Sequence, residues 1–357
     1  MGIIITMLLR VLFMTSLLYL TACGGGSSAQ SQPDYGPEIT GPLFTASPLD
    51  QSAISLVTGQ GHLAPYPHTL PTPHVYLYWH AASPVTALLP VVAPGPGTIT
   101  FVLDQGGDYK IMVRSSPTLT WYMDHIILAP GLGLQSVLKP GMAIGTTSTR
   151  SSAIDLGLLD STVTNPFIAP QRYGADLLTC VSPWTRFTPE LRSQFSALSN
   201  VIGPNKDGAV CFDKAGTVAG NWFLDGVPDS PDAYGRPENW PKQLAFVRDE
   251  TDGRRWRISV GGTISPAALW AIADGDPEPT AMSSGPGTRI IRLYPNLAAD
   301  GGMIPSGWLL VRLDAYERLY VEYISAIDHP PATAVDTPVT DFTGGQRLYR
   351  RTQGANG

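Results

Sequence analysis

The chain has 357 residues, a formal net charge of −6 and only 15% charged residues. This acidic balance without a basic stripe excludes a typical nucleic-acid-binding protein. The sequence contains 37 glycines and 33 prolines, and so many helix-breaking residues exclude a long helical bundle or a coiled coil. Because tyrosines, tryptophans and phenylalanines are available for a core, we expect a folded, turn-rich β protein.

The N-terminus resembles an export signal. Residues 3–20 are apolar except for Arg10, and Leu20-Thr21-Ala22-Cys23 follows. An apolar segment that ends in small residues is typical of a secretory signal peptide. The last four residues resemble the lipobox of bacterial lipoproteins, which implies cleavage of residues 1–22 and lipid attachment at Cys23. A plain transmembrane anchor is the alternative.

Residues 23–50 are expected to form a flexible tether and lead-in, because GGGSSAQSQ follows the cysteine. The residue after the cysteine is Gly24. By resemblance to the sorting rules of double-membrane bacteria, an aspartate at this position would favour retention in the inner membrane. We therefore expect an outer-membrane lipoprotein that faces the periplasm, with the lipid bilayer as its partner through Cys23.

Two cysteines remain after lipidation, Cys180 and Cys211. An exported protein lies in a compartment where disulfides persist, so the sequence favours a bond between these two residues. Two free thiols are the alternative, because a sequence does not give their separation.

Short strand patterns separated by turn residues predict a first β domain over residues 51–160. The candidate strands are 74–80, 84–92, 97–104, 108–114, 119–128, 137–147 and 152–160. Residues 161–206 are expected to form a partly helical linker. Its one clear helix is predicted for 188–200, where Thr188 can cap and Pro189 occupies the first position.

Residues 207–351 are predicted to form a second β domain, followed by a tail at 352–357. Asp252-Gly253 indicates a hairpin turn, and a second hairpin is expected across Asp314-Ala315-Tyr316. A final run ending in QRLYRR is expected to add an edge strand. The predicted fold class is therefore mainly β: two β domains with one short helical segment between them.

The order of elements within residues 70–160 resembles lysostaphin-type (duplicated hybrid motif) zinc metallopeptidases. Ser83–Ala87 is similar to the family's first core strand and Pro96–Val102 to the next. Tyr122-Met123-Asp124-His125 stands in the place of its Tyr-x-His, and Leu138–Gly145 is similar to its glycine turn. The resemblance implies a β-sandwich, and no family is suggested for the C-terminal half.

The zinc ligands of the family are only partly present. His74 matches the first ligand, but Tyr78 stands where an aspartate is required. In the closing strand the family has a His-x-His motif whose second histidine binds zinc. Here Asp155 stands at that second histidine and Ala153 at the first. His125 resembles the family histidine that acts as general acid/base or stabilises the oxyanion. A hydrolytic zinc needs three protein ligands and an open position, so we expect no catalytic residue and no cofactor, with zinc only if the chain is a divergent peptidase.

His62, His68, His74 and His80 recur every six residues. One interpretation is a histidine-rich metal site that includes His74, His80 and Asp155; the other is four unrelated histidines in a proline-rich segment. Tyr76, Tyr78 and Tyr122 are candidate ligand-contacting residues, because the resemblance places them with His125 around the groove of the domain.

These observations favour an exported, non-catalytic binding or scaffold protein of the cell envelope, which contacts peptidoglycan or envelope proteins. That target follows from analogy with degenerate family members and not from residue chemistry. A divergent zinc metallopeptidase that cleaves peptidoglycan crosslinks and a purely structural lipoprotein are the two alternatives.

Overall fold

The computed structural model describes residues 35–79, 88–203, 206–272, 275–293, 296–297, 303–304, 307–325 and 340–353. Predictions for the signal peptide, Cys23, the tether before residue 35, His80 and residues 84–87 lie outside these ranges. Among the described residues, no helix is both long and apolar enough to cross a bilayer.

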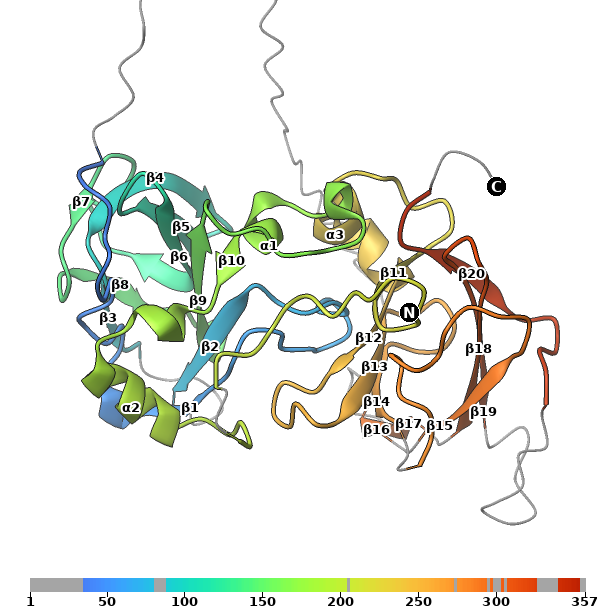
Figure 1. The fold of residues 1–357 in the computed structure, drawn as a ribbon. Coiled ribbons are helices and arrows are strands. Elements are labelled where there is room, and N and C mark those ends of the chain that lie inside the picture. The colour runs from blue at the N-terminus through green and yellow to red at the C-terminus, as the bar shows by residue number, and fades with distance from the viewer. Residues whose placement is uncertain are drawn as a thin grey trace, which may run out of the picture. The chain divides into compact units, whose positions relative to one another are not determined.

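The first sheet has ten strands in the order β1-β2-β9-β6-β5-β4-β7, with β10 beside β9 and β8 joining β3 to β6. Its strands are β1 (Ile54–Val57), β2 (His74–Trp79), β3 (Pro90–Val92), β4 (Gly97–Asp104), β5 (Tyr109–Arg114), β6 (Leu119–Leu128), β7 (Val137–Leu138), β8 (Ala143–Thr147), β9 (Ala153–Asp160) and β10 (Cys180–Val181). Figure 1 shows β2, β9 and β6 side by side. Trp121, Leu158 and Ile111 are fully buried in the core of this sheet.

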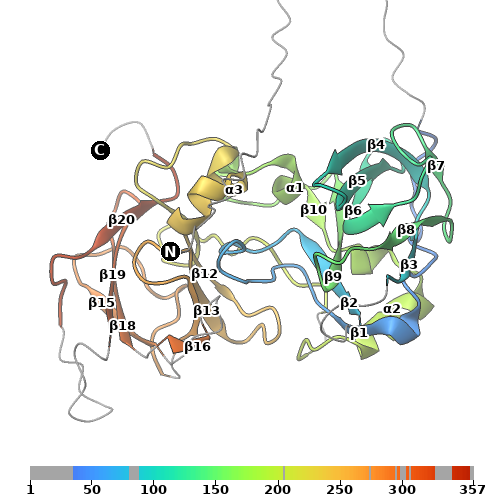
Figure 2. The same cartoon turned by 180° about the vertical axis from the view of Figure 1, so that it is seen from behind.

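The second sheet has eight strands in the order β14-β13-β12-β11-β20-β19-β18-β15. They are β11 (Gly220–Leu224), β12 (Gln243–Arg248), β13 (Trp256–Val260), β14 (Ala268–Ala271), β15 (Arg289–Leu293), β18 (Gly307–Leu313), β19 (Arg318–Ser325) and β20 (Arg347–Arg350), while β16 (Asn296–Leu297) and β17 (Met303–Ile304) pair separately. Figure 2 shows this sheet from behind. Trp222, Phe246 and Trp270 fill its core.

The helices are short, and all but η1 fall between β9 and β12 in the sequence. They are α1 (Ala175–Leu178), α2 (Pro189–Ala197) and α3 (Asp232–Gly235), with 3-10 turns η1 (Gln51–Ala53), η2 (Pro170–Arg172), η3 (Pro183–Arg186) and η4 (Pro237–Lys242). The Thr188 side chain accepts a hydrogen bond from the backbone N–H of Leu191, and Pro189 is the first residue of α2. The predicted helix is therefore present with its predicted cap, although it ends at Ala197.

The mainly β fold class is confirmed. Both predicted hairpins are present, since β12 pairs with β13 and β18 with β19, each antiparallel. The prediction of an edge strand at the C-terminus is wrong, because β20 lies inside the sheet and pairs with both β11 and β19. Tyr349 in β20 is fully buried, and this apolar anchor holds the strand between its two neighbours.

Candidate functional site

Strand register brings four of the predicted site residues, His74, Tyr76, Tyr122 and Asp155, to neighbouring strands. β9 lies between β2 and β6, and Tyr76 faces Asp155, which in turn faces Asp124. His74 and Tyr122 flank Gly157 in the same way. A side chain at 157 would not fit, because a Cβ placed there would lie 2.0 Å from Cζ of Tyr122. The glycine thus lets the Tyr122 ring cross β9 to reach His74.

His74 is 9% exposed and both of its ring nitrogens have protein partners. The Tyr76 hydroxyl lies 2.9 Å from Nε2 and the Tyr122 hydroxyl lies 3.3 Å from Nδ1. Oδ2 of Asp155 is also 3.2 Å from Nε2. Burial lowers the pKa of His74 well below its ordinary value, and the neighbouring His68 and Lys110 charges act in the same direction. The imidazole is therefore neutral at neutral pH.

Asp155 lies between the two histidines of the site. Its Oδ2 is 3.2 Å from Nε2 of His74 and 3.8 Å from Nε2 of His125. The carboxyl is 5% exposed, and its Oδ1 has no hydrogen-bond partner. Burial raises the pKa of Asp155 to about 7, although the charge of His125 opposes this shift.

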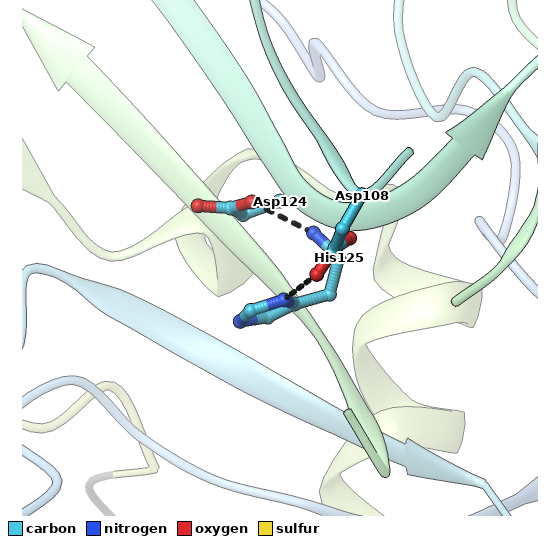
Figure 3. A group of neighbouring side chains, drawn as sticks. All are labelled: Asp108, Asp124 and His125. Atoms are coloured by element: carbon cyan, nitrogen blue, oxygen red, sulfur yellow. Dashed lines mark hydrogen bonds and ion pairs between the residues drawn. The ribbon is translucent and has the colours of Figure 1, made fainter. Parts of the chain in front are cut away.

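A bulge in the β5–β6 hairpin sets the position of His125. Tyr109 faces Ile126 and Ile111 faces Met123, so Asp124 and His125 together oppose Lys110. His125 consequently has a φ of 65°, and its backbone N–H donates to Oδ1 of Asp124 at 2.8 Å. Its Nδ1 lies 2.9 Å from Oδ2 of Asp108 (Figure 3).

Residues 58–73 run beside this polar cluster and contribute two further rings. His62 packs on Tyr76 with ring centroids 4.9 Å apart, and its Nδ1 lies 2.5 Å from Oε1 of Glu250. The His68 ring is 6.2 Å from His74. Burial, reinforced by the charges of His62 and His125, lowers the pKa of His68 to about 4.

The predicted site residues therefore come together in part. His74, Asp155 and His125 converge, whereas His80 lies outside the described residues. The hydroxyls of Tyr76 and Tyr122 contact His74. Because Tyr122 is 1% exposed and Tyr76 is 8% exposed, little of either side chain is available to a ligand. Tyr78 stacks on Tyr76 at 5.8 Å and keeps more exposure than either.

The cysteines are a correction to the predicted disulfide, because Cys180 and Cys211 are both free thiols in this structure. Cys180 is buried, its thiol faces the carbonyl of Leu177, and Nδ2 of Asn165 lies 3.4 Å from its sulfur. Burial raises the pKa of Cys180 to about 12 and that of Cys211 to about 11. The reactive thiolate is therefore scarce at both positions.

Two carboxylates of the site escaped the sequence analysis. Asp108 is 4% exposed, immediately precedes β5 and contacts His125. The candidate strands 108–114 and 119–128 follow one another closely, and if they pair as a hairpin their outer ends meet, which would bring Asp108 near His125. Glu250 comes from the β12–β13 loop and reaches His62 across 188 residues of sequence, a separation that no local pattern reveals.

Comparisons with known proteins give similarity at the level of solved structures. No protein-family model and no curated protein matches the sequence. Similar structures include Csd3 of Helicobacter pylori, with 19% identity over 35% of this chain and 33% of Csd3 at a TM-score of 0.27. A zinc-containing peptidase from Vibrio cholerae has 14% identity over 33% of this chain and 37% of its own, also at 0.27.

The solution structure of lysostaphin is similar over 72% of this chain and 90% of its own, with 11% identity and a TM-score of 0.24. The chain spans about a third of the length of Csd3 and of the V. cholerae peptidase. At such TM-scores the similarity does not carry over to activity or to metal content.

Proposed function

We propose that this chain is a non-catalytic binding protein of the bacterial cell envelope, held to a membrane through Cys23 and contacting peptidoglycan or a cell-wall enzyme. The lipobox-like residues 20–23 and the glycine-rich tether after them support the location. The geometry around His74 supports the absence of catalysis.

The double hydrogen bonding of His74 carries this proposal. A catalytic zinc needs a ligand nitrogen with a free lone pair, two more protein ligands and an open position for water. Here the Tyr76 and Tyr122 hydroxyls engage Nε2 and Nδ1. Tyr78 takes the place of the second ligand, and burial raises its pKa to about 12, so it remains a neutral, weakly coordinating phenol at neutral pH.

A cavity of about 560 Å³ offers a binding surface for a peptide or glycan. Such a volume lies within the usual range for ligand pockets. Residues from three segments line it, among them Gln60, Phe212 and Arg254. The Phe212 ring and the exposed guanidinium of Arg254 suit a polar polymer with apolar parts.

The test is co-sedimentation of the purified protein with peptidoglycan sacculi, combined with analysis of the muropeptides after incubation with zinc. We expect sedimentation and no new fragments. Ala209→Trp, which fills the cavity, should weaken sedimentation, whereas the exposed Ala281→Trp should not. Failure to sediment would favour a purely structural lipoprotein.

A divergent zinc metallopeptidase is the second candidate, because His74, Asp155 and His125 do converge. It predicts chelator-sensitive cleavage of peptide crosslinks that is abolished in His74→Gln. Crosslink cleavage with that pattern would overturn the non-catalytic proposal.

A further inference from the structure

We propose that Asp108, Asp124 and His125 bind a divalent cation, for which Mn²⁺ serves as the probe, at a site separate from His74. One donor atom from each of the three residues lies within 4.8 Å of the other two. Figure 3 shows the Asp108 carboxylate at Nδ1 of His125, with Asp124 on the neighbouring backbone position. This site does not depend on the proposed function.

The first supporting observation is an unused acceptor inside the cluster. Asp108 is 4% exposed, and its Oδ1 is buried without a hydrogen-bond partner. A buried carboxylate oxygen without a partner is costly, and a missing ion or water is the usual reason for one. A cation at Asp108 and His125 would supply that partner.

A second, independent observation comes from β9. Asp155 is 5% exposed, its Oδ2 lies 3.8 Å from Nε2 of His125, and its Oδ1 also has no partner. If His125 binds an ion through Nδ1, its Nε2–H points at this carboxylate. A carboxylate on the second nitrogen is the arrangement that typically orients a metal-binding histidine.

The charge of the surroundings favours a cation as well. Asp108, Asp124 and Asp155 gather around a single imidazole. The neighbouring Lys110 places its ammonium 4.4 Å above the Tyr122 ring, on the His74 side of the cluster. A dication would offset the charges of Asp108 and Asp124, the two carboxylates that adjoin this imidazole in the cluster.

The donor set and its spacing fit an octahedral divalent ion, and Mn²⁺ is one such ion. Two carboxylates and one imidazole are a harder set than the histidine-rich ligands typical of zinc, and carboxylate and water suit manganese. The Nδ1–Oδ2 separation of 2.9 Å between His125 and Asp108 is close to the roughly 3.0 Å between adjacent ligands of an octahedral ion with bonds of about 2.1 Å. Water would complete the shell.

The experiment is a titration of the full-length chain in detergent with Mn²⁺, read by loss of the electron paramagnetic resonance signal of the free ion. We expect one ion per chain. Asp124→Asn and Asp108→Asn should each weaken binding by at least about tenfold, and Asp155→Asn by about tenfold through His125. The exposed turn variant Asp104→Asn is the matched control and should bind like the wild type.

His74→Gln separates this site from the His74 position: because His74 contacts only Asp155 of these residues, at 3.2 Å, the variant should retain binding and weaken it by no more than Asp155→Asn does. A rise in melting temperature with Mn²⁺, present in the wild type and absent in Asp124→Asn, gives a second readout if Asp108→Asn folds poorly. The proposal is overturned by no binding at millimolar Mn²⁺, by wild-type affinity in both Asp108→Asn and Asp124→Asn, or by loss of binding in His74→Gln. A zinc-dependent peptidase activity would overturn the proposed function without affecting this result.

Discussion

The two sheet regions bury charges of opposite sign, arginines around the second sheet and carboxylates in the first. Around the second sheet, Arg351 is 1% exposed and pairs with Glu317, and the fully buried Arg172 pairs with Asp229 at 2.5 Å. In the first sheet, Asp108 and Asp155 are equally buried, yet each has one oxygen without a partner. The arginines reach acids that remain partly exposed, whereas the two carboxylates gather around histidines, and it is this second arrangement that the proposed cation site would use.

The largest expected effect tests the structural half of this comparison. Arg351→Ala removes the partner of Glu317 and the donor to the backbone carbonyls of Thr217 and Ala219, and it uncovers Trp222. Because Glu317 keeps 28% of its side chain exposed, the loss comes mainly from removing a fully buried side chain and its hydrogen bonds, and we expect about 3–5 kcal/mol of unfolding free energy. Urea denaturation measures it.

Arg350→Ala is the matched control, because the Arg350–Asp225 pair is more exposed. We expect it to cost no more than about 1 kcal/mol. Equal losses in the two variants would mean that burial does not distinguish these pairs.

The sequence predicts the scaffold of both regions better than it predicts their charge networks. The α2 cap follows from Thr188-Pro189, and the β12–β13 hairpin follows from Asp252-Gly253, because caps and turns depend on adjacent residues. The partners of Arg351 and His62 lie 34 and 188 residues away, and only tertiary packing brings them together. The role of Asp108 could have been predicted in principle. It begins the candidate strand 108–114, and pairing that strand with 119–128 places it near His125.

The next effect is a pH dependence of the folding stability, which we expect from the buried His68 beside the first sheet. Burial lowers the pKa of His68 to about 4, so the folded protein holds this ring neutral while the unfolded chain protonates it near pH 6.5. The folded state then binds fewer protons than the unfolded state between pH 4 and 6.5, and its stability falls as the pH drops through this window.

His68→Gln should remove part of that loss, on the order of 1–3 kcal/mol between neutral pH and pH 4. Denaturation curves at several pH values measure it. His74 and His62 face the same ring, so a residual slope is expected. An unchanged slope in the variant would show that His68 does not titrate as its burial requires.

Gly157→Ala tests the close packing that brings Tyr122 to His74. The added Cβ would lie 2.0 Å from Cζ and 2.5 Å from the hydroxyl oxygen of Tyr122, so the ring must move. Overpacking of this kind costs about 1–3 kcal/mol. Thermal or urea unfolding measures the loss, and Gly133→Ala, with open space around its Cβ position, is the control. Equal stability of the Gly157 variant and wild type would mean that the ring yields freely.

The smallest expected change in stability is the most informative about the His74 position. Tyr76→Phe removes the hydroxyl 2.9 Å from Nε2 of His74 and should cost about 0.5–1.5 kcal/mol, the net value of one hydrogen bond. If this hydroxyl blocks metal binding at Nε2, its loss frees the nitrogen beside Oδ2 of Asp155, and zinc affinity at His74 should rise. Competition with a zinc-sensitive dye measures that affinity, and Tyr78→Phe is the control because no contact joins its hydroxyl to His74.

The two outcomes distinguish two reasons why His74 would not hold zinc. A rise in affinity would show that the Tyr76 hydroxyl blocks the metal. Unchanged affinity would mean that the missing third ligand at residue 78 is sufficient by itself, since a single imidazole–carboxylate pair holds zinc weakly.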